Sequence, residues 1–469
     1  SPLEQTLSYT FRYGHQVALL ANHLICHNTG RKDVLCHSHP TTPETGITLH
    51  QQENDSDLVL KLLQPMDDEA LANTAILFRV WSQSVPIELK LLARQVPYRI
   101  DAGKGALFSR EVQAITSLLM VVSGRIRNLP DEDRLDIARQ LLRFPHVGLK
   151  EPELEQLARF LAGFGEGWHE RLLAMDFDAL APMAAKKLRK LGETLAQLER
   201  FKGSVADLIS RYAEETELYE GIRSLALTHE TADERIETIR GFRLYLSGLD
   251  VSIDGALEHL KALKKQAGEN RHGGALLSTI HRTKGLEWST VILPGLQEKY
   301  LPYSPRAQDD PKAFLESERR LLYVAMTRTR EQLHLITRPF GEKRHLDGDQ
   351  GPSRFVDELC FPLSQEFGQW LGGRSCDSAD ALTATVPLTS TGLRYAHLQG
   401  VTLQTSTEAT AEETTPLWAR NRLSHAIFGP GSVTGEDERS FEVAFDNGDT
   451  LNFSKKSAHL YFTAMSSRA

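Results

Sequence analysis

Several features are missing from this chain of 469 residues, and their absence narrows the class of protein to which it can belong. No apolar run approaches the roughly 20 residues that a membrane-spanning helix needs, and we find no charged-then-apolar signal peptide, so no membrane partner is expected. Cysteines are few and scattered, which argues against a disulfide framework and predicts a reducing, cytoplasmic location. The chain also starts at Ser1 without a methionine, which suggests an excised or processed segment.

An excess of positive charge is missing as well. The formal net charge is −8, which argues against a generally basic nucleic-acid binder but leaves room for a local basic groove. The hydrophobic content of 41% is ample for real cores, and the length suits about three domains. We therefore expect a globular, mixed α/β protein.

Two residue pairs have a spacing that is typical of zinc sites. His23 and Cys26 would lie on one face of a helix, whereas Cys36 and His39 would lie in an extended segment. Cysteines on an apolar face with histidines at the surface are the simpler interpretation. No metal site is therefore predicted in this chain.

What the chain does contain is two polar segments beside apolar runs. Residues 278–288 read STIHRTKGLEW and lie between the runs 275–280 and 290–293, which predict buried parallel strands. Loops at strand ends are where open α/β sheets bind ligands. Residues 318–330 read ERRLLYVAMTRTR and predict a helix that carries several arginines, followed by a strand over 332–337. Guanidinium groups bind phosphate oxygens well, so a phosphate site is expected here.

These segments resemble motifs V and VI of superfamily 1A DNA helicases of the UvrD, PcrA and Rep kind. Residues 7–14, LSYTFRYG, resemble motif IV of the same family, and residues 73–83, NTAILFRVWSQ, resemble a family segment whose arginine contacts DNA. Trp81 stands where the family usually has Asn, and both stacking on a base and simple packing stay open for it. The resemblance runs through nearly the whole chain.

The resemblance implies four residues at a nucleotide site. Arg328 and Arg12 are expected to flank the γ-phosphate of ATP and to act in catalysis. Phe11 is expected to stack on the adenine, and Glu287 to hold the ribose. An arginine supplied in this way can raise the turnover rate by a factor of about 10³–10⁵.

The resemblance also implies a set of DNA-binding residues. Thr279 and His281 are expected to grip the DNA backbone, with Arg79 beside them. Lys284 could reach a phosphate too, although a salt bridge within its own loop is the alternative.

The fold that the resemblance implies is α/β. It combines a RecA-like (P-loop NTPase-type) parallel-sheet domain with an inserted all-α domain and a small C-terminal SH3/Tudor-like β-barrel. The expected boundaries are 1–123 for the first part of motor domain 2A, 124–270 for the inserted helical 2B domain, 271–340 for the second part of 2A, 341–416 for an irregular segment and flexible linker, and 417–460 for the barrel.

The residue patterns themselves support the helical and barrel parts. Helices are predicted over 132–143, 151–164, 183–202, 205–214 and 233–246. The basic residues of 183–202 are most simply a solvated face, although contact with duplex DNA stays open. Short alternating strands over 441–445 and 450–453, with Pro-Gly and Asn-Gly turns, predict a small antiparallel barrel.

A phosphate loop of the form GxxxxGK[ST] does not occur in the chain. The loop and the Mg²⁺ ligands are therefore expected on a missing N-terminal RecA-like domain, and this chain is expected to be inactive alone. The implied function is the C-terminal part of an ATP-dependent 3′–5′ DNA helicase and translocase, with ATP and Mg²⁺ as cofactors, in DNA repair or replication.

The implied partners are single-stranded and forked DNA, the N-terminal RecA-like domain, and RNA polymerase or a repair protein at the barrel. The alternative is a non-catalytic helicase-like remnant that binds DNA or protein. A helicase–nuclease subunit is a weaker third hypothesis, because the C-terminal end lacks an acidic metal-binding cluster.

Overall fold

The computed structural model describes residues 8–101, 105–177, 180–269, 273–303, 310–339, 351–373, 388–401, 418, 422–425, 429–446, 448, 450–455, 458 and 462–464. The chain folds into two compact units. The first unit comprises Ser1–Leu58, Ala72–Arg79 and Ser278–Ala469, and the second comprises Val59–Leu71 and Val80–Leu277. Each unit is described by itself below.

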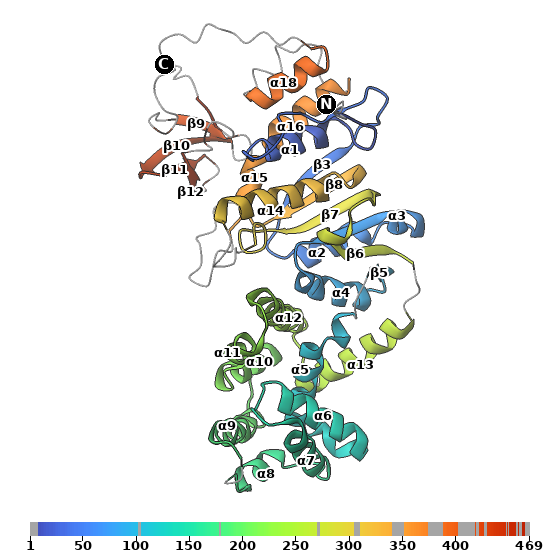
Figure 1. Cartoon of the computed structure of the whole chain (residues 1–469), viewed down its shortest axis with the longest axis vertical. Helices are drawn as coiled ribbons and strands as arrows, with labels where there is room; N and C mark the ends of the chain where they lie inside the picture. The colour runs from blue at the N-terminus through green and yellow to red at the C-terminus, as the bar shows by residue number, and fades with distance from the viewer. Residues whose placement is uncertain are drawn as a thin grey trace, which may run out of the picture. The chain divides into compact units, whose positions relative to one another are not determined.

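A parallel sheet forms the centre of the first unit. Within it, β3 (Gly46–Gln51), β8 (Thr329–Thr337), β7 (Trp288–Leu296) and β4 (Thr74–Phe78) are neighbours in this order, and each adjacent pair is parallel (Figure 1). Every residue of β4 is buried, as are most of those of β7. The apolar composition of these strands follows, because a parallel sheet is covered on both faces. The predicted buried parallel strand over 290–293 is confirmed, because this run lies within β7.

Helices α1 (His15–Ile25), α14 (Pro311–Met326) and α16 (Phe361–Leu371) pack around this sheet. The helix α14 contacts β7 and β8, and α1 contacts α14, α16 and β3 (Figure 1). The start of α14 is set by Asp310, whose side chain accepts a hydrogen bond from the backbone N–H of Lys312, and by proline at the first helical position.

The predicted arginine-bearing helix is shorter than expected. It was predicted to carry Arg328 and Arg330 as well as Arg319 and Arg320, but α14 ends at Met326. Arg328 lies in a turn and Arg330 lies in β8. That part of the prediction is wrong, because pairing of β8 with β7 requires extended backbone from Thr329 onward.

Shorter elements complete the first unit. They are β1 (Tyr9–Thr10), β2 (His37–Ser38), the 3₁₀ turn η4 (Ile280–Arg282), α15 (Arg354–Glu358) and α18 (Ser390–Leu398). Two further helices, α2 (Asp55–Leu63) and α3 (Asp68–Ala72), lie where the chain passes between the units.

The segment 341–416 was predicted to be irregular, and part of it is helical. Besides α15 and α16, residues 390–398 form α18, whose Tyr395 is fully buried. The hydroxyl of Tyr395 lies 3.0 Å from Nδ1 of His15 and accepts a hydrogen bond from the backbone N–H of Ser38 at 3.2 Å. One buried aromatic anchor thus holds a helix whose sequence shows little periodicity. Most of the predicted flexible linker, residues 377–387 and 402–416, lies outside the described residues.

The C-terminal residues form a five-stranded antiparallel sheet. Its order is β12 (Thr450–Ser454), β11 (Ser440–Phe445), β10 (Gly429–Glu436), β9 (Arg422–His425) and β13 (Phe462–Ala464). Buried side chains on one side form its core, including Leu423, Phe441, Val443, Phe445 and Phe462. The predicted antiparallel strands are confirmed, whereas closure into a Tudor-like barrel stays a prediction.

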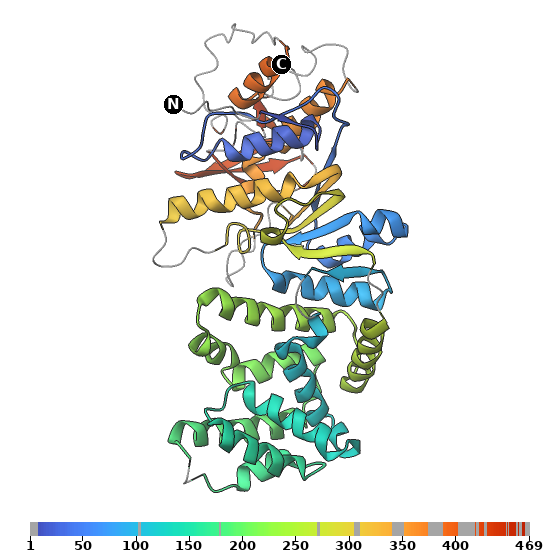
Figure 2. The same cartoon turned by 45° about the vertical axis from the view of Figure 1, so that its right-hand side comes forward.

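The second unit is mostly helical (Figure 2). Its helices are α4 (Ser84–Ala93), α5 (Arg110–Val122), α6 (Asp131–Arg143), α7 (Glu151–Ala162), α8 (Trp168–Ala174), α9 (Pro182–Leu198), α10 (Val205–Glu215), α11 (Leu218–Leu225), α12 (His229–Ser247) and α13 (Ile253–Glu269). Three 3₁₀ turns are η1 (Trp81–Gln83), η2 (Ala106–Phe108) and η3 (Arg125–Asn128), and β5 (Tyr98–Ile100) pairs in parallel with β6 (Ala275–Thr279). The five predicted helices are confirmed with shifted ends.

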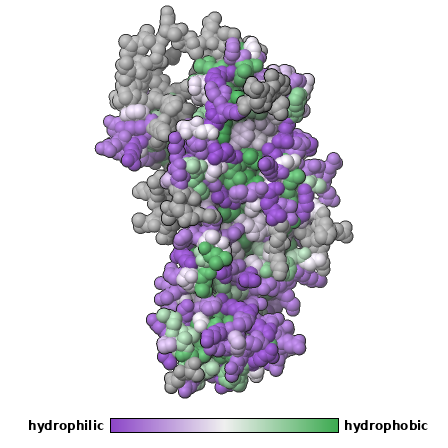
Figure 3. All heavy atoms as spheres, viewed as in Figure 1, coloured by the Kyte–Doolittle hydropathy of each residue, from purple (hydrophilic) through white to green (hydrophobic). Residues whose placement is uncertain are grey.

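Hydrophilic residues cover most of the face that Figure 3 displays, and hydrophobic residues appear there in small groups. Across the described residues, exposed large hydrophobic side chains include Phe11, Met183 and Leu227. In the same part of the chain, no helix combines the length and apolar composition needed to cross a bilayer.

A buried carboxyl group in the second unit predicts a pH dependence of stability. Glu88 of α4 is 2% exposed and accepts hydrogen bonds from the Tyr98 hydroxyl at 3.0 Å and the Ala106 N–H at 2.8 Å. Burial raises the pKa of Glu88 from 4.5 to about 7, although both hydrogen bonds oppose the change.

Because the folded-state pKa of Glu88 is raised, the native protein holds more protons than the unfolded chain between pH 4.5 and about 7, so stability falls as pH rises through this window. Glu88→Gln should therefore raise the free energy of unfolding at pH 8 by on the order of 2 kcal/mol and change it little at pH 4.5. Urea unfolding of both proteins at the two pH values measures this, and a variant that is equally stabilised at both would contradict it.

Candidate functional site

Two of the predicted site residues are brought together by strand register. In the parallel pair of β7 and β8, Trp288 is the partner of Thr329, and the N–H of Trp288 donates to the carbonyl of Arg328 at 3.0 Å. Glu287 and Arg328 directly precede these strands, so they are neighbours although they are distant in sequence. The site thus lies at the amino ends of β7 and β8, whereas open α/β sheets present most of their ligand groups at carboxyl ends.

Arg12, near the start of the chain, lies beside Glu287 at the amino ends of β7 and β8. Its Nε donates to Oε2 of Glu287 at 2.6 Å, and its Nη1 donates to the carbonyl of Thr327 at 3.1 Å. The segment is held by Thr45, whose hydroxyl accepts from the N–H of Gly14 at 2.9 Å and donates to the carbonyl of Arg330 at 2.6 Å. Three separated segments of the chain therefore meet at one surface point.

Two more guanidinium groups lie beside Glu287. Arg328 donates from Nε to the carbonyl of Val324 at 3.0 Å and from Nη1 to the carbonyl of Leu286 at 3.3 Å. Nη1 of Arg330 lies 3.8 Å from Oε1 of Glu287. We refer to Arg12, Arg328, Arg330 and Glu287 as the arginine cluster.

The charges of the arginine cluster do not balance. The hydrogen bond from Arg12 lowers the pKa of Glu287, and the positive charges of Arg12, Arg330 and Arg328 act in the same direction. Burial and then the nearby charge of Arg12 lower the pKa of Arg328. Because three guanidinium groups face one carboxylate in this part of the chain, the cluster suits an anion of several charges, and partial exposure keeps it accessible.

An aromatic ring stands next to the arginine cluster. Phe11 directly precedes Arg12 and is 68% exposed. Its ring centroid lies 4.4 Å from that of His39, with 34° between the planes. An exposed, supported aromatic ring beside cationic groups provides a flat apolar surface on which a heterocycle can stack.

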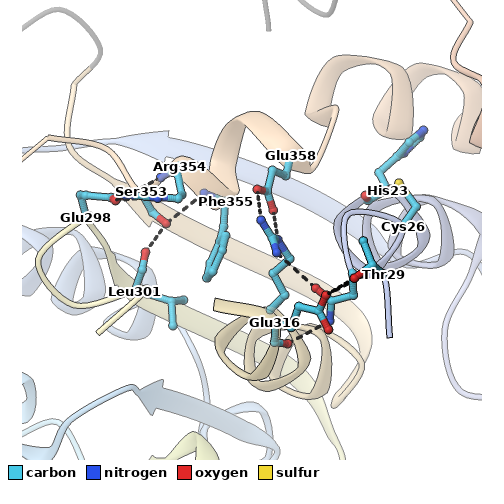
Figure 4. A network of polar contacts seen from close by, with 12 residues as sticks. His23, Cys26, Thr29, Glu298, Leu301, Glu316, Ser353, Arg354, Phe355 and Glu358 are labelled. Atoms are coloured by element: carbon cyan, nitrogen blue, oxygen red, sulfur yellow. Dashed lines mark hydrogen bonds and ion pairs between the residues drawn. The ribbon is translucent and has the colours of Figure 1, made fainter. Parts of the chain in front are cut away.

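Polar contacts of Glu316 and Arg319 hold α14 against neighbouring segments of the first unit (Figure 4). Oε1 of Glu316 accepts from the N–H and the hydroxyl of Thr29 at 2.8 and 2.9 Å. Arg319 makes a bidentate ion pair with Glu358 of α15, with donor–acceptor distances of 2.6 and 2.7 Å. Ser353 hydrogen-bonds the carbonyl of Leu301 and so ties the start of α15 to the loop before α14 (Figure 4). These contacts fix the helix that leads into Arg328.

Sequence reasoning missed these supporting residues. The segment 352–355 resembles a motif that trails motif VI, but nothing in it identifies Glu358 as the partner of Arg319. Their pairing depends on how α15 packs, which local patterns do not report.

Arg79 has a protein partner in the structure. Its Nε and Nη2 donate to the two carboxylate oxygens of Glu318 at 2.8 and 2.9 Å, and its guanidinium lies 5.0 Å from the ring centroid of Tyr303. The Arg79 and Glu318 side chains are only 13% and 5% exposed. The DNA contact expected of Arg79 stays a prediction.

The other predicted DNA-binding residues follow β6. Thr279 ends that strand and is half-buried, whereas His281 in η4 and Lys284 in the next turn are exposed. The buried hydroxyl of Thr283 donates to the carbonyl of Ile280 at 2.7 Å and shapes this loop. Within the described part of the chain Lys284 makes no ion pair, so the salt bridge considered for it is not seen there.

The residues with zinc-like spacing make other bonds. His23 is buried, with its two ring nitrogens 3.1 Å from the Ser364 hydroxyl and 2.7 Å from the Thr389 hydroxyl. The thiol of Cys26 donates to the carbonyl of His23. Burial lowers the pKa of His23 to about 4, so it is neutral at physiological pH.

Comparison with known proteins places these features in a family context. Residues 172–338 match the UvrD-like helicase C-terminal domain family, a range that includes β6, β7, α14 and β8. The chain is 26% identical over 389 residues to the ATP-dependent DNA helicase PcrA of Bacillus subtilis, which covers 77% of this chain and 50% of that protein.

It is also 27% identical over 473 residues to DNA helicase II of Salmonella typhimurium, covering 94% of this chain and 59% of the relative. The ATP-dependent DNA helicase Rep of the same species is 26% identical over 310 residues, covering 61% and 43%. The chain therefore spans about half the length of the curated relatives that it matches.

Proposed function

We propose that this chain, which carries the C-terminal region of a UvrD/PcrA/Rep-like superfamily 1A helicase, supplies the second motor domain of an ATP-dependent DNA helicase. The observation that supports the proposal is the arginine cluster, in which Arg12, Arg328 and Arg330 surround Glu287 beside the exposed ring of Phe11. Surplus positive charge next to a stacking surface suits a nucleoside triphosphate.

In this proposal each residue acts on a different part of ATP. Arg12 and Arg328 contact the γ-phosphate, where their charges stabilise the negative charge spread over the phosphoryl oxygens in the transition state. Phe11 stacks on the base. Glu287 orients Arg12 and accepts a hydrogen bond from the ribose.

The phosphate loop and the Mg²⁺ ligands belong, in the same proposal, to a preceding RecA-like domain. Mg²⁺ bound there would neutralise phosphate charge, and a residue of the same domain would orient the attacking water. The groups of this chain that face the phosphates in the proposal, Arg12 and Arg328, are cationic, which fits a role opposite the triphosphate rather than a role in binding the metal.

Movement along DNA would follow because the affinity of the two motor domains for each other depends on the nucleotide bound between them. Arg12 and Arg328 favour a closed arrangement of the two motor domains while a γ-phosphate lies between them, and hydrolysis removes that preference. Thr279, His281, Lys284 and Arg79 would together form one grip on single-stranded DNA, and alternation of this grip with that of the preceding domain would give 3′–5′ translocation and unwinding of forked duplexes. The C-terminal sheet would dock RNA polymerase or a repair protein, in DNA repair or replication.

The direct test uses the protein with its preceding motor domain. ATP turnover is measured in Mg²⁺ with and without single-stranded DNA, and unwinding is measured on duplexes with a 3′ or a 5′ tail. We expect DNA-stimulated turnover and unwinding of the 3′-tailed substrate. Folded protein without turnover would instead support the non-catalytic binding remnant.

A substitution at Glu287 separates function from stability. The Arg12–Glu287 pair is 29% and 41% exposed, so Glu287→Gln should change the free energy of unfolding by less than about 1 kcal/mol. Loss of the charge that orients Arg12 should nevertheless lower ATP turnover by roughly tenfold or more. Steady-state kinetics and thermal unfolding measure both quantities. Glu331→Gln, the same change on the neighbouring strand, is the control, and equal effects of both variants would contradict the role of Glu287.

A further inference from the structure

Strand register places a histidine directly against Phe11. The parallel pair of β1 and β2 aligns Tyr9 with His37 and Thr10 with Ser38, so the next position in each segment holds Phe11 and His39. The ladder continues at this position, because the N–H of His39 donates to the carbonyl of Thr10 at 2.9 Å. The side chains of Phe11 and His39 therefore project on the same side, and their rings are in contact.

The imidazole of His39 is itself held in place. Its Nδ1 accepts a hydrogen bond from the N–H of Thr41 at 3.2 Å and lies 2.8 Å from the Thr41 hydroxyl. The ring of Tyr9 packs edge-on against it, with centroids 5.6 Å apart and 70° between planes. A ring fixed on two sides can act as a rigid support.

Phe11 needs such a support. At 68% exposed, it has no surrounding core that would fix its ring, so stacking a ligand on it would otherwise require ordering of the side chain. A side chain already held in its bound conformation binds more tightly because this cost is removed. The face of Phe11 that His39 does not cover is the one available to a ligand.

We propose that His39 is a positioning residue that holds the Phe11 ring for stacking against the base of the nucleotide. The inference rests on the proposed function, since it assumes that a nucleotide binds beside Arg12. It adds a residue outside the helicase motifs and predicts that His39 affects recognition of the base but not of the phosphates.

The test measures recognition of the base and recognition of the phosphates separately, in the intact protein. One measurement is KM and kcat for ATP, and the other is the inhibition constant of inorganic tripolyphosphate, which has no base. His39→Ala should raise KM for ATP roughly two- to tenfold, the usual worth of an aromatic pair, while kcat and the tripolyphosphate constant stay within twofold. His39→Leu, which keeps volume without an aromatic ring, should behave in the same way and serves if the alanine variant does not fold.

Two further variants complete the design. His39→Phe keeps a ring that Tyr9 can support but cannot bond Thr41, so it should reverse most but not all of the rise in KM. In the Phe11→Ala background, His39→Ala should have no added effect, because the two act as one unit.

The outcomes distinguish this inference from its premise. The role of His39 is overturned, and the proposed function stands, in either of two cases. In the first, Phe11→Ala raises KM but His39→Ala does not. In the second, His39→Ala weakens binding of tripolyphosphate as much as it raises KM for ATP. Failure of His39→Phe to reverse most of the rise in KM also overturns that role. If turnover is normal and Phe11→Ala leaves KM unchanged, the premise that Phe11 stacks on the base fails.

Discussion

Replacing Arg328 with alanine in the intact protein is expected to lower kcat for ATP hydrolysis by roughly 10³-fold or more. Its guanidinium belongs to the arginine cluster, where nearby backbone carbonyls of Val324 and Leu286 orient it. A charge held in place before the reaction stabilises the transition state without further reorganisation. Burial and the charge of Arg12 oppose the charged form of Arg328, so an approaching phosphate would relieve an existing repulsion.

The matched control for this variant is Arg320→Ala. Arg320 comes from the same motif, but its side chain is 51% exposed and its ion pair with Glu316, at 3.8 Å, lies within α14 and away from the cluster. We expect that variant to retain turnover within about twofold, because exposed ion pairs contribute little.

Single-stranded DNA affinity, measured by fluorescence anisotropy, should stay within a few-fold for Arg328→Ala. Equal losses of turnover and DNA affinity would contradict the assigned role, since a catalytic arginine acts on the nucleotide alone. Addition of free guanidinium should partly restore turnover to Arg328→Ala and have no such effect on the Arg320 variant.

Strand and helix content was predictable because it depends on local periodicity. The apolar runs before and after residues 278–288 became β6 and β7, and the run 332–337 became most of β8. The same reasoning failed at Arg328, because it extended the helix through the polar run 327–330, where pairing of Thr329 with Trp288 requires a strand. Tertiary pairing outweighed local preference there.

The resemblance predicted that Arg12, Glu287 and Arg328 share one site, but it did not predict their contacts with one another. That Arg12 would contact Glu287 follows from the Thr45 hydrogen bonds that fix Gly14 beside β8, and no sequence pattern encodes that contact. The aromatic contact of His39 with Phe11 depends likewise on pairing of two-residue strands, which are too short to leave a periodic signal.

A second large effect is expected at Arg79, where a contact with DNA and a structural ion pair predict different results. Breaking a buried ion pair by removing one partner leaves the other charge uncompensated, which costs about 3–5 kcal/mol. The Arg79–Glu318 pair is bidentate and nearly excluded from solvent, and Oε2 of Glu318 also accepts from the N–H of Tyr303 at 3.0 Å. Arg79→Ala and Glu318→Ala should therefore each lower the free energy of unfolding by about 3 kcal/mol.

The double variant Arg79→Met with Glu318→Met is the control, because it removes both charges and keeps comparable volume. It should be less destabilised than the sum of the two single methionine variants, since neither charge remains unpaired. Urea unfolding of the four proteins provides this cycle. Strict additivity would show that the pair contributes no coupling energy.

The DNA contact predicts a separate signature. If Arg79 binds a phosphate, Arg79→Ala should reduce the salt dependence of single-stranded DNA affinity by about 0.7 in slope, whereas Glu318→Gln should not weaken binding and could release the guanidinium for it. If Arg79 mainly supports α14, both variants should lower ATP turnover and leave the slope unchanged, since Glu318 lies on the helix that leads into Arg328. Measured together, the unfolding cycle and the salt slope assign Arg79 to one role, because a phosphate contact changes the salt slope and a purely structural ion pair with Glu318 does not.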